Sequence, residues 1–531
     1  MVASAGAAAQ PAPGEIRLVI AASALGAVFE WYDFFVYGTL AVLFGRLFFP
    51  STNPATGFLL ALATFGVGFA VRPIGAVVFG VLGDRLGRKY TFIVTITLMG
   101  AATAAIGVLP TYASIGVAAP ILLVSLRALQ GFALGGEYGG ASIYVAEHAA
   151  PHQRGLFTAF IQIGPVLGLL TSLLVSTGTV LAVGEEAAAA WGWRVPFLVS
   201  LLLLAVSLWM RFRLAESPVF RAMKAAGTTA RSPLRESFGS WARTQRILAA
   251  LGLAAGQAVV GYTALFQSMY FLQDTLHVQA GPARLIAIAA ACAGVGCYFL
   301  FGWLSDRVGR KKPVVIGYLL TLLLLFPLFH FMAGQANPGL ANAMASRPVV
   351  LTGSDCSFNP FRSKEQRTPC GRLIDLLSKQ GIAYTKAEAA GRAAPFVTIG
   401  GTRVDASDPQ ALAARLRGAG YNLDAVAPQL PAALLIVLAL IVLYALAGMT
   451  YGSVAAWLVE LFPAPVRYTS LSIPYHFGVG YAGGFLPFIS QFIVAKTGDP
   501  FAGLWYVIAV VAVALVVTVL LLPETAGRDL D

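Results

Sequence analysis

The chain contains twelve apolar stretches that are each long enough to cross a lipid bilayer as a helix. About 20 apolar residues span the hydrocarbon core at about 1.5 Å of rise per residue. Of the 531 residues, 58% are hydrophobic and only 11% are charged, whereas soluble domains carry about 25% charged residues. The sequence therefore predicts an all-α membrane protein with twelve transmembrane helices. The stretches lie near 16–46, 57–81, 91–109, 118–146, 155–183, 192–212, 247–272, 281–303, 313–333, 431–457, 469–494 and 502–522.

The distribution of Lys and Arg predicts which side of the membrane each loop faces. The loops after the second, sixth and eighth stretches are basic, whereas the loops 109–117 and 184–191 contain no Lys or Arg. Because basic residues concentrate in cytoplasmic loops, we expect the even-to-odd loops and both termini to be cytoplasmic, in the inner (plasma) membrane of a bacterial-type cell. The net charge of +12 is then explained by topology, and it does not indicate nucleic-acid binding.

Two motifs occur once in each half of the chain. GVLGDRLGRK recurs as GWLSDRVGRK 222 positions later (306 − 84), and a Glu and an Arg seven residues apart recur 313 positions later (460 − 147). The difference of 91 positions (313 − 222) matches one long polar stretch, so it predicts an insertion within the second half. The repeated residues are Asp84, Glu147 and Arg154 in the first half and Asp306, Glu460 and Arg467 in the second.

These repeats divide the chain into two pseudo-symmetric six-helix bundles and an insertion between the ninth and tenth helices. The insertion is expected on the extracytoplasmic side, because the charge rule fades for long loops. The first residues lack the basic start of a signal peptide and are predicted to be disordered. The predicted parts are the disordered N-terminus 1–15, the N-terminal bundle 16–212, the cytoplasmic linker 213–246, the C-terminal bundle 247–336 with 428–522, the insertion 337–427 and the cytoplasmic tail 523–531.

The insertion has the periodicity of a small α/β domain. A strand, a helix, three strands and a second helix are predicted within 347–421, and the last two strands meet at a Gly-Gly turn. This order, with Cys356 just after the first strand, resembles a glutaredoxin-like module, although CSFN stands where that family has C-x-x-C. An oxidising compartment favours a disulfide between Cys356 and Cys370, whose loop of about 15 residues is worth about 3 kcal/mol. Cys292 and Cys297 lie in the eighth apolar stretch and are expected to be packing residues.

Several motifs resemble those of the major facilitator superfamily. GVLGDRLGRK and its echo GWLSDRVGRK look like its signature loop, and RALQGFALGGEYGG at 127–140 is similar to its fourth-helix signature. FEWYDFFVYG (29–38), FAVRPIGAVVFG (69–80) and LAESPVF (214–220) resemble the metabolite:H⁺ symporter branch. The resemblance covers nearly the whole chain except 337–430 and the first dozen residues. It implies the major facilitator fold and transport of a metabolite such as α-ketoglutarate, citrate, shikimate, proline or betaine.

Ionisable residues within the apolar stretches are candidates for proton coupling, because a charge at mid-membrane costs at least about 2.5–3.5 kcal/mol. Asp33 and Arg127 resemble the first-helix acid and the fourth-helix arginine that couple protons in related carriers. We expect them to pair, so that an anionic substrate competing for Arg127 frees Asp33 to take a proton. The alternative is that these charges pair permanently and only hold helices together. The proton-coupling candidates are Asp33, Glu30, Glu137 and Arg127.

Two arginines in an otherwise apolar cavity favour a carboxylate substrate, because the guanidinium fork matches a carboxylate with two hydrogen bonds. Tyr37 shares one helix face with Glu30 and Asp33, at the spacing i, i+3, i+7. Polar residues of the second half are candidate neutral contacts, or alternatively ordinary interior residues that hydrogen-bond between helices. The substrate-binding candidates are Arg72, Arg127, Tyr37, Gln130, Gln257, Gln267, Tyr270, Tyr475 and His476.

The duplicated charges beside the basic loops predict a charge network at the cytoplasmic mouth. The network would hold one conformation and break in the other, which would bias alternating access by rocking of the two halves. The alternative, that these charges mark topology only, does not account for the duplicated acids, because Asp and Glu contribute little to the charge rule. The gating candidates are Asp84, Arg85, Arg88, Glu147, Arg154, Asp306, Arg307, Arg310, Glu460 and Arg467.

The sequence contains no Walker-type phosphate loop, His-Glu-x-x-His or paired C-x-x-C, so it predicts no nucleotide, metal or cofactor and no enzyme activity. We expect a proton-coupled symporter, monomeric in the bilayer, that moves a small organic acid (dicarboxylate, tricarboxylate or shikimate-like) by alternating access. The alternatives are a compatible-solute (proline or betaine) carrier or an exchanger, a membrane-anchored thiol-disulfide redox protein that uses the insertion, and a transporter-like receptor that binds its ligand without transport.

Overall fold

The structure, a computed structural model, describes residues 13–50, 54–213, 216–354, 356–357, 368–379, 382–388, 394–404 and 409–530. Among these residues, twelve helical segments are long and apolar enough to cross a membrane. This confirms the prediction of an all-α membrane protein with twelve transmembrane helices. Most of the predicted disordered segment 1–15 lies outside the described residues, and the first helix, α1, begins at Pro13.

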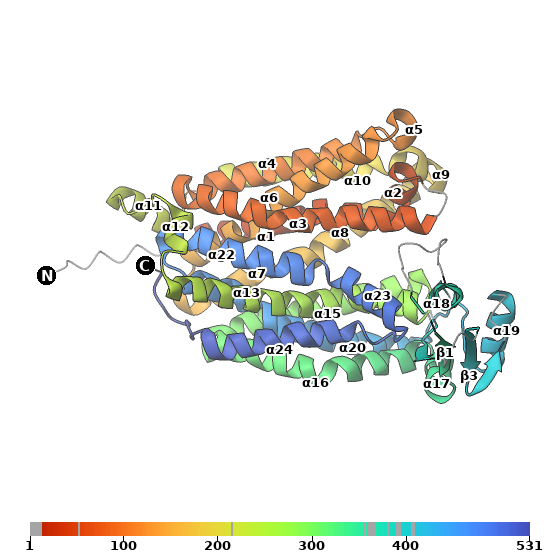
Figure 1. Cartoon of the computed structure of the whole chain (residues 1–531). Coiled ribbons are helices and arrows are strands. Elements are labelled where there is room, and N and C mark those ends of the chain that lie inside the picture. The colour runs from red at the N-terminus through yellow and green to blue at the C-terminus, as the bar shows by residue number, and fades with distance from the viewer. Residues whose placement is uncertain are drawn as a thin grey trace.

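The N-terminal half contributes the first six spanning segments, drawn from red to yellow in Figure 1. Apolar helices satisfy their backbone hydrogen bonds internally, as a chain surrounded by lipid requires. The spanning helices are α1 (Pro13–Thr39), α3 (Pro54–Leu86), α4 (Arg88–Gly107), α6 (Ala118–His148), α7 (Arg154–Gln162) continued by α8 (Gly164–Val183), and α10 (Arg194–Phe212). The short helices are α2 (Ala41–Phe48), α5 (Tyr112–Ile115), η1 (Pro151–Gln153), α9 (Glu185–Ala187) and η2 (Ala188–Gly192).

The backbones of α3 and α6 are in contact because glycines occupy the positions where the two helices meet. A Cβ on Gly131 would collide with the carbonyl oxygen of Gly68, and a Cβ on Gly135 would collide with the carbonyl oxygen of Arg72. Small residues allow helices in a membrane to approach this closely. The packing therefore fixes the position of Arg72 on α3 relative to α6.

The C-terminal half contributes the other six spanning segments, and its seventh and eleventh segments contain π-helical turns (η3, η4 and η6). The linker between the halves forms α11 (Pro218–Ala226) and α12 (Pro233–Ser237). The seventh segment consists of α13 (Trp241–Tyr262), η3 (Thr263–Gln267), α14 (Ser268–Tyr270) and η4 (Phe271–Thr275). The remaining segments are α15 (Ala280–Val308), α16 (Lys311–Ala336), α20 (Leu430–Tyr451) with α21 (Val454–Leu461), η5 (Ala464–Val466) with α22 (Arg467–Phe477), η6 (Gly478–Gly483) and α23 (Leu486–Thr497), and α24 (Leu504–Leu521).

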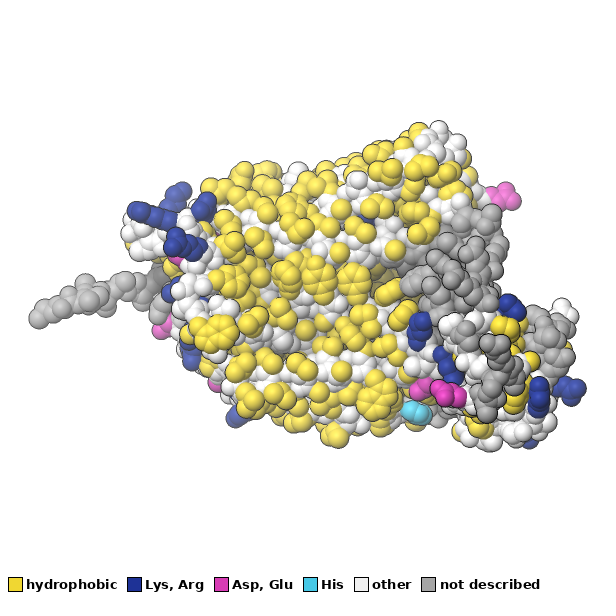
Figure 2. All heavy atoms as spheres, in the orientation of Figure 1, with side chains coloured by type: hydrophobic (Ala, Val, Ile, Leu, Met, Phe, Trp, Pro, Cys, Tyr) yellow, Lys and Arg dark blue, Asp and Glu magenta, His cyan; other side chains and the backbone are white. Residues whose placement is uncertain are grey.

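The two halves lie side by side and meet along α3, α6 and α7 of the first and α15, α21 and α22 of the second (Figure 1). The linker helices α11 and α12 lie at one end of the molecule and the insertion lies at the other. We call the first the clamp end, because it carries Asp84 and Asp306, and the second the insertion end. Figure 2 shows hydrophobic side chains over both bundles, with Lys and Arg side chains at the clamp end and around the insertion at the other end. This arrangement is that of a lipid-facing belt flanked by an aqueous surface.

The insertion between α16 and α20 is a four-stranded sheet with the strand order β2-β1-β3-β4. Strands β1 and β2 are parallel, whereas the other two pairs are antiparallel. Gly400 and Gly401 form the β3–β4 turn with φ values of 55° and 82°, as a tight hairpin requires. The element order is the one predicted. The elements are α17 (Pro338–Ser346), β1 (Val349–Gly353), α18 (Pro369–Lys379), β2 (Thr385–Glu388), β3 (Phe396–Ile399), β4 (Thr402–Val404) and α19 (Pro409–Gly418).

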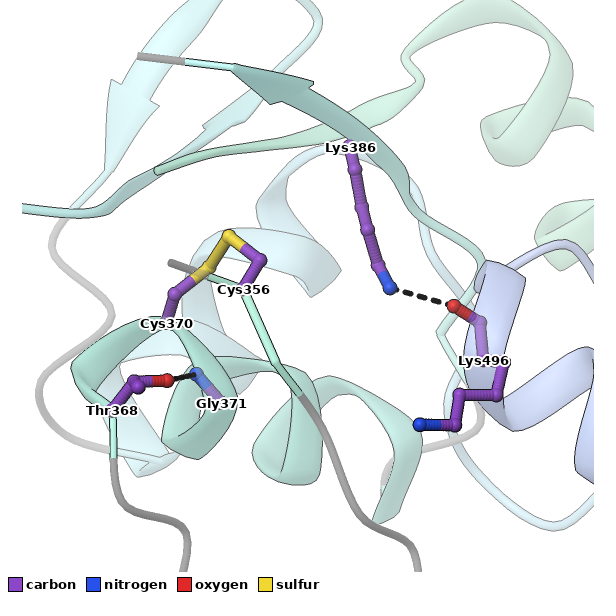
Figure 3. The surroundings of a disulfide bond; sticks show 6 residues. All are labelled: Cys356, Thr368, Cys370, Gly371, Lys386 and Lys496. Carbon is purple, nitrogen blue, oxygen red and sulfur yellow. Dashed lines mark hydrogen bonds between the residues drawn. A yellow bond between two sulfur atoms is a disulfide. The ribbon is translucent and has the colours of Figure 1, made fainter. Parts of the chain in front are cut away.

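A disulfide joins Cys356, after β1, to Cys370, in the first turn of α18, as the sequence predicts (Figure 3). Cys370 is buried in the small core of the insertion, and Cys356 is half-buried. The sulfur atoms lie over Gly353, where a Cβ would be only 2.9 Å from each. The disulfide therefore ties the end of the central strand to the first turn of the helix that follows it in the chain.

The insertion is attached to loops of the C-terminal half at the insertion end. The Tyr384 amide donates to the carbonyl oxygen of Gly498 at 2.9 Å. Lys386 Nζ donates to the carbonyl oxygen of Lys496 at 2.6 Å (Figure 3). Val426 and the His277–Gln279 loop exchange backbone hydrogen bonds, with a parallel bridge between Val278 and Val426. These contacts join the insertion to the ends of the seventh and eleventh spanning segments.

Candidate functional site

A cavity lies between the two halves. Its wall combines one acid and one arginine with a ring of aromatic side chains contributed by both halves. The residues that line it include Glu30, Trp31, Arg72, Leu134, Tyr138 and Gln162 from the N-terminal half and Tyr262, Tyr298, Tyr451, Tyr475 and His476 from the C-terminal half.

Arg72 is the buried cation of this cavity, and its guanidinium is only partly satisfied. Its carbon Cζ lies 4.2 Å from the ring centroid of Phe69, 4.6 Å from that of Phe34 and 5.1 Å from that of Trp31. Its Nε and Nη2 atoms have no hydrogen-bond partner among the described residues. Aromatic faces stabilise a cation only modestly, and unpaired buried donors are costly. The cavity therefore presents donors suited to an anion.

Asp33 and Arg127 do not form the direct ion pair that the sequence predicts. Arg127 Nη1 donates instead to Gln130 Oε1 at 2.7 Å, and its guanidinium lies 4.4 Å from the Phe34 ring centroid and 4.6 Å from that of Tyr37. No oxygen of Asp33 lies within ion-pair distance of Arg127 in the described structure. Gln130 takes the place of the acid at Nη1, whereas Nε and Nη2 of Arg127 have no hydrogen-bond partner among the described residues. Both charges are buried in the N-terminal bundle, behind the residues that line the cavity.

The other predicted substrate residues divide into two groups. Tyr475 and His476 line the cavity together with Arg72, and neither ring nitrogen of His476 has a hydrogen-bond partner in the part of the chain that the structure describes. Tyr37 donates its hydroxyl to the carbonyl oxygen of Ala61 at 2.9 Å and faces away from the cavity. The residues outside the cavity lining are Tyr37, Arg127, Gln130, Gln257, Gln267 and Tyr270.

Aromatic side chains from opposite halves meet on both sides of the cavity. Toward the clamp end, the rings of Tyr138 on α6 and Tyr475 on α22 stack at a centroid distance of 3.5 Å and an angle of 4°. Toward the insertion end, Phe35 on α1 meets Phe266 on η3 at 5.6 Å. The cavity is thus bordered toward each end of the molecule by a pair of rings, and each pair takes one ring from each half. Sequence reasoning missed this aromatic wall, whose only signal is the number of tyrosines in otherwise apolar helices.

At the clamp end, each half caps a helix of the other half with an aspartate. Asp84 accepts hydrogen bonds from the amides of Tyr468 at 3.1 Å and Thr469 at 2.9 Å, at the start of α22. Asp306 accepts from the amides of Gly155 and Leu156, both at 2.8 Å, at the start of α7. A carboxylate at a helix N-terminus satisfies free amides and complements the helix dipole. The two contacts are pseudo-symmetric, as the sequence repeat predicts.

Two buried ion-pair networks accompany these caps, and most predicted gating residues belong to them. Glu147 pairs with Arg467 of the opposite half at 2.9 Å and with Arg88 at 3.7 Å. In the second copy, Arg310 pairs with Asp306 at 2.6 Å and with Glu460 at 2.9 Å, and Arg154 of the opposite half lies 3.8 Å from Glu460.

Arg85 and Arg307 lie outside these networks. Arg85 is exposed and donates to the carbonyl oxygen of Arg231, and Arg307 is exposed beside the Trp303 ring. Both point outward from the helix ends that carry the clamp, and neither forms an ion pair among the described residues. The clamp therefore uses one arginine from each signature loop, which is Arg88 in the first half and Arg310 in the second.

Sequence reasoning also missed two glutamates, one in each half, that each cap a helix of their own half. Glu216 accepts from the amides of Arg88 and Lys89 at the start of α4. Glu524 accepts from the amides of Arg310 and Lys311 at the start of α16, and from two amides of its own turn. Partial burial by itself would raise the pKa of Glu524, but these four backbone donors hold the pKa below its usual value. The sequence did contain a signal for these caps, because the similar segments LAES and LPET, each with a glutamate in third place, follow the sixth and twelfth spanning segments.

Comparison with known proteins agrees with this fold and site. Residues 18–241 match the family described as sugar (and other) transporter, and residues 141–351 match MFS/sugar transport protein. The shikimate transporter of Escherichia coli K12 is 39% identical over 318 residues, which cover 59% of this chain and 71% of that protein. The inner membrane metabolite transport protein YhjE of the same strain is 36% identical, covering 70% of this chain and 82% of that protein.

Compatible-solute carriers are about equally similar. The glycine betaine/proline/ectoine/pipecolic acid transporter OusA of Dickeya dadantii is 38% identical over 60% of this chain and 64% of that protein. Among solved structures, the proton:xylose symporter XylE bound to 6-bromo-6-deoxy-D-glucose superimposes with a TM-score of 0.67 at 17% identity, covering 97% of this chain and 98% of that one. Its inward-open form from E. coli gives a TM-score of 0.55. At this identity, the likeness shows the fold alone.

The fold and the cavity define a class of protein, the twelve-helix transporters built from two rocking halves. The chain belongs to the major facilitator superfamily, and its relatives place it in the metabolite:H⁺ symporter branch. The family consists of membrane transporters and not of enzymes.

Proposed function

We propose that the protein is a proton-coupled symporter that moves a small organic acid across the inner membrane by alternating access. The clamp end then faces the cytoplasm together with both termini, the insertion faces the opposite side, and the carrier acts as a monomer. The observation that carries the proposal is the buried, partly unpaired guanidinium of Arg72 in the cavity between the halves.

Arg72 would bind the carboxylate of the substrate. A guanidinium offers two parallel N–H groups that match the two oxygens of a carboxylate, and the bond gains strength away from water. The tyrosines and His476 around it can hydrogen-bond hydroxyl groups on a compact ring or chain. The charge and the polar wall together fit an organic acid better than a neutral sugar.

Glu30 would couple this binding to a proton. It lines the same cavity as Arg72 and interacts with it electrostatically. When a substrate carboxylate takes Arg72, Glu30 loses part of its counter-charge and becomes easier to protonate. Asp33 and Arg127 remain proposed contributors to the proton step, since they are buried close to this wall, and Glu137 is proposed to contribute only to the charge balance around Glu30.

The clamp would provide the alternation between two conformations. The caps and ion pairs join the two halves at the clamp end in this structure. Opening toward the cytoplasm must separate these partners, and closing restores them. The caps and ion pairs that join the halves support the assignment of this structure to a state closed at the clamp end.

A compatible-solute carrier is the second candidate, and the aromatic wall is the observation that favours it. Trp and Tyr faces bind quaternary ammonium groups through cation–π interactions. A betaine would place its carboxylate on Arg72 and its ammonium group among Trp31, Tyr138, Tyr262 and Tyr451. Relatives of both kinds are similar to this chain.

The test is uptake into proteoliposomes across a panel of shikimate, dicarboxylates, tricarboxylates, proline and glycine betaine, with and without an imposed pH gradient. We expect an acid to accumulate only with the gradient, and Arg72→Lys to abolish this accumulation. Arg221→Lys, an exposed linker residue, is the matched control and should transport normally. Uptake of a betaine with failure of every acid would replace the first candidate by the second. Exchange without net uptake would identify an exchanger, and binding without any flux would identify a receptor.

A further inference from the structure

Arg211 on α10, which the sequence motifs do not single out, is fully enclosed in the N-terminal bundle. Its Nη2 forms an ion pair with Glu137 Oε1, its Nη1 donates to the carbonyl oxygen of Phe92 at 3.3 Å, and its guanidinium lies 4.0 Å from the Phe92 ring centroid. The second oxygen of Glu137 accepts from Thr95 Oγ1 at 3.0 Å. Both oxygens of Glu137 are therefore engaged, and this acid does not line the cavity.

The same guanidinium also lies against α1, one helical turn from Glu30. A Cβ on Gly26 would collide with Arg211 Nη2, so the arginine crosses α1 at the place that glycine leaves open. Gly26 and Glu30 are four residues apart and share a helix face. Arg211 thus lies beside two acids, Glu137, which it pairs with, and Glu30, which faces the cavity. The ionisable groups around Glu30 are Arg72 from α3, Glu137 and Tyr138 from α6, Arg211 from α10, Asp33 from α1 itself, and Tyr262, Tyr475 and His476 across the cavity.

The buried charges of this region balance when all of them are ionised. Away from the clamp end, the buried acids of the N-terminal half among the described residues are Glu30, Asp33 and Glu137. The buried arginines of the same region are Arg72, Arg127 and Arg211. A substrate carboxylate at Arg72 adds one negative charge to this balanced set. Because uncompensated buried charge is very costly, one acid must then take up one proton.

We propose that Arg211 is a positioning residue that keeps Glu137 ionised and stabilises the free carboxylate of Glu30, so that Glu30 takes up one proton for each substrate carboxylate that binds. This inference rests on the proposed function and deepens it, because it assigns the protonated group and the coupling ratio. The step is a simple protonation: the Glu30 carboxylate becomes a carboxylic acid when the substrate enters, and it releases the proton when the substrate leaves. Transport of a monocarboxylate is then electrically neutral.

The coupling ratio can be measured from accumulation in proteoliposomes. A gradient of one pH unit drives about tenfold accumulation through one proton and about hundredfold through two. We expect about tenfold for a monocarboxylate, with no change when a membrane potential is imposed by a potassium gradient and valinomycin. A hundredfold ratio, or accumulation that follows the membrane potential, would overturn the charge balance. A wild-type carrier that exchanges substrate but ignores the pH gradient would instead overturn the proposed symport.

Charge-restoring variants test which acid carries the proton. Arg211→Gln leaves three acids against two arginines, so gradient-driven accumulation should fall and its pH profile should move toward alkaline pH. Adding Glu137→Gln to Arg211→Gln restores the balance and should restore accumulation and the wild-type pH profile. Glu30→Gln should lose gradient-driven accumulation while it still exchanges labelled for unlabelled substrate. A double variant that exchanges substrate but cannot accumulate it would show that Glu137 carries the proton, and it would contradict the proposal.

Discussion

Asp84 and Tyr468 belong to opposite halves of the chain and are 384 residues apart, yet the Tyr468 amide donates to the Asp84 carboxylate at 3.1 Å. Asp306 makes the equivalent contact with the Gly155 amide at 2.8 Å. Each half therefore holds the first turn of a helix in the other half, and the closed clamp end depends on two carboxylates.

Replacing Asp84 by Asn should slow transport several-fold without changing membrane insertion. The amide keeps the shape of the side chain but removes the charge that complements the helix dipole and the nearby Arg88, a loss of about 1 kcal/mol. Initial uptake rates, corrected for the amount of protein in the membrane, measure the effect. Asp424→Asn, at an exposed site in the insertion, is the matched control. Unchanged uptake by Asp84→Asn would refute the gating role.

The substitution Gly83→Ala should shift the protein toward the conformation that is open at the clamp end. The Tyr468 ring fills a socket formed by Gly83, Gly139 and Gly140, and its hydroxyl donates to the carbonyl oxygen of Gly136. A Cβ on Gly83 would collide with the ring, so Gly83→Ala should favour the conformation in which the halves separate. Alkylation of a cysteine introduced at the clamp-side cavity wall should speed up. Gly178→Ala on α8, where a Cβ meets nothing within 4 Å, should leave the rate unchanged.

The contribution of Glu524 to stability should depend on pH in one direction. Four backbone donors hold its pKa below the usual value despite partial burial, so the ionised form stabilises the folded state. This contribution is complete above the unfolded pKa of about 4.3 and is lost as the pH falls through the lower folded pKa. The difference in melting temperature between wild type and Glu524→Gln should therefore be largest near neutral pH and shrink below about pH 4. A difference that grows on acidification would contradict the cap.

Much of the fold follows from the sequence, because lipid leaves few choices. Apolar length predicts the spanning segments, and the two copies of the signature loop predict that Asp84 and Asp306 act alike. In the insertion, the Gly400–Gly401 turn and the apolar periodicity predict the strand and helix order. These features depend on local patterns and internal repeats, which can be recognised in a single sequence.

The candidate site was harder to predict, because side-chain partners depend on geometry that spacing does not give. Asp33 and Arg127 lie on neighbouring helices, α1 and α6, yet Gln130 binds the arginine instead. Arg211 belongs to no recognisable sequence motif, and its position near Glu30 becomes visible only in the structure, where it lies against Gly26. The aromatic wall is assembled from helices far apart in the sequence, so the rings that meet could not be matched in advance.

The disulfide of the insertion should contribute to local stability and not to transport. Closing a loop of about 15 residues is worth about 3 kcal/mol, so Cys356→Ser should make the insertion more sensitive to protease. Because the insertion is attached to outer loops and lies away from the cavity, uptake should be retained. Cys292→Ser, an exposed position on α15, is the control. Loss of a reductase activity in Cys356→Ser would instead support a redox function.

The most direct test of the account is equilibrium binding of the best-transported carboxylate to the purified protein, measured by titration calorimetry for wild type and Arg72→Gln. A charge-assisted bidentate contact in a buried site is worth about 1.5–3 kcal/mol, so the variant should bind about tenfold to a hundredfold more weakly. Arg221→Gln should bind like wild type. Equal affinity of Arg72→Gln and wild type for the same carboxylate would contradict the central claim that this guanidinium holds the substrate.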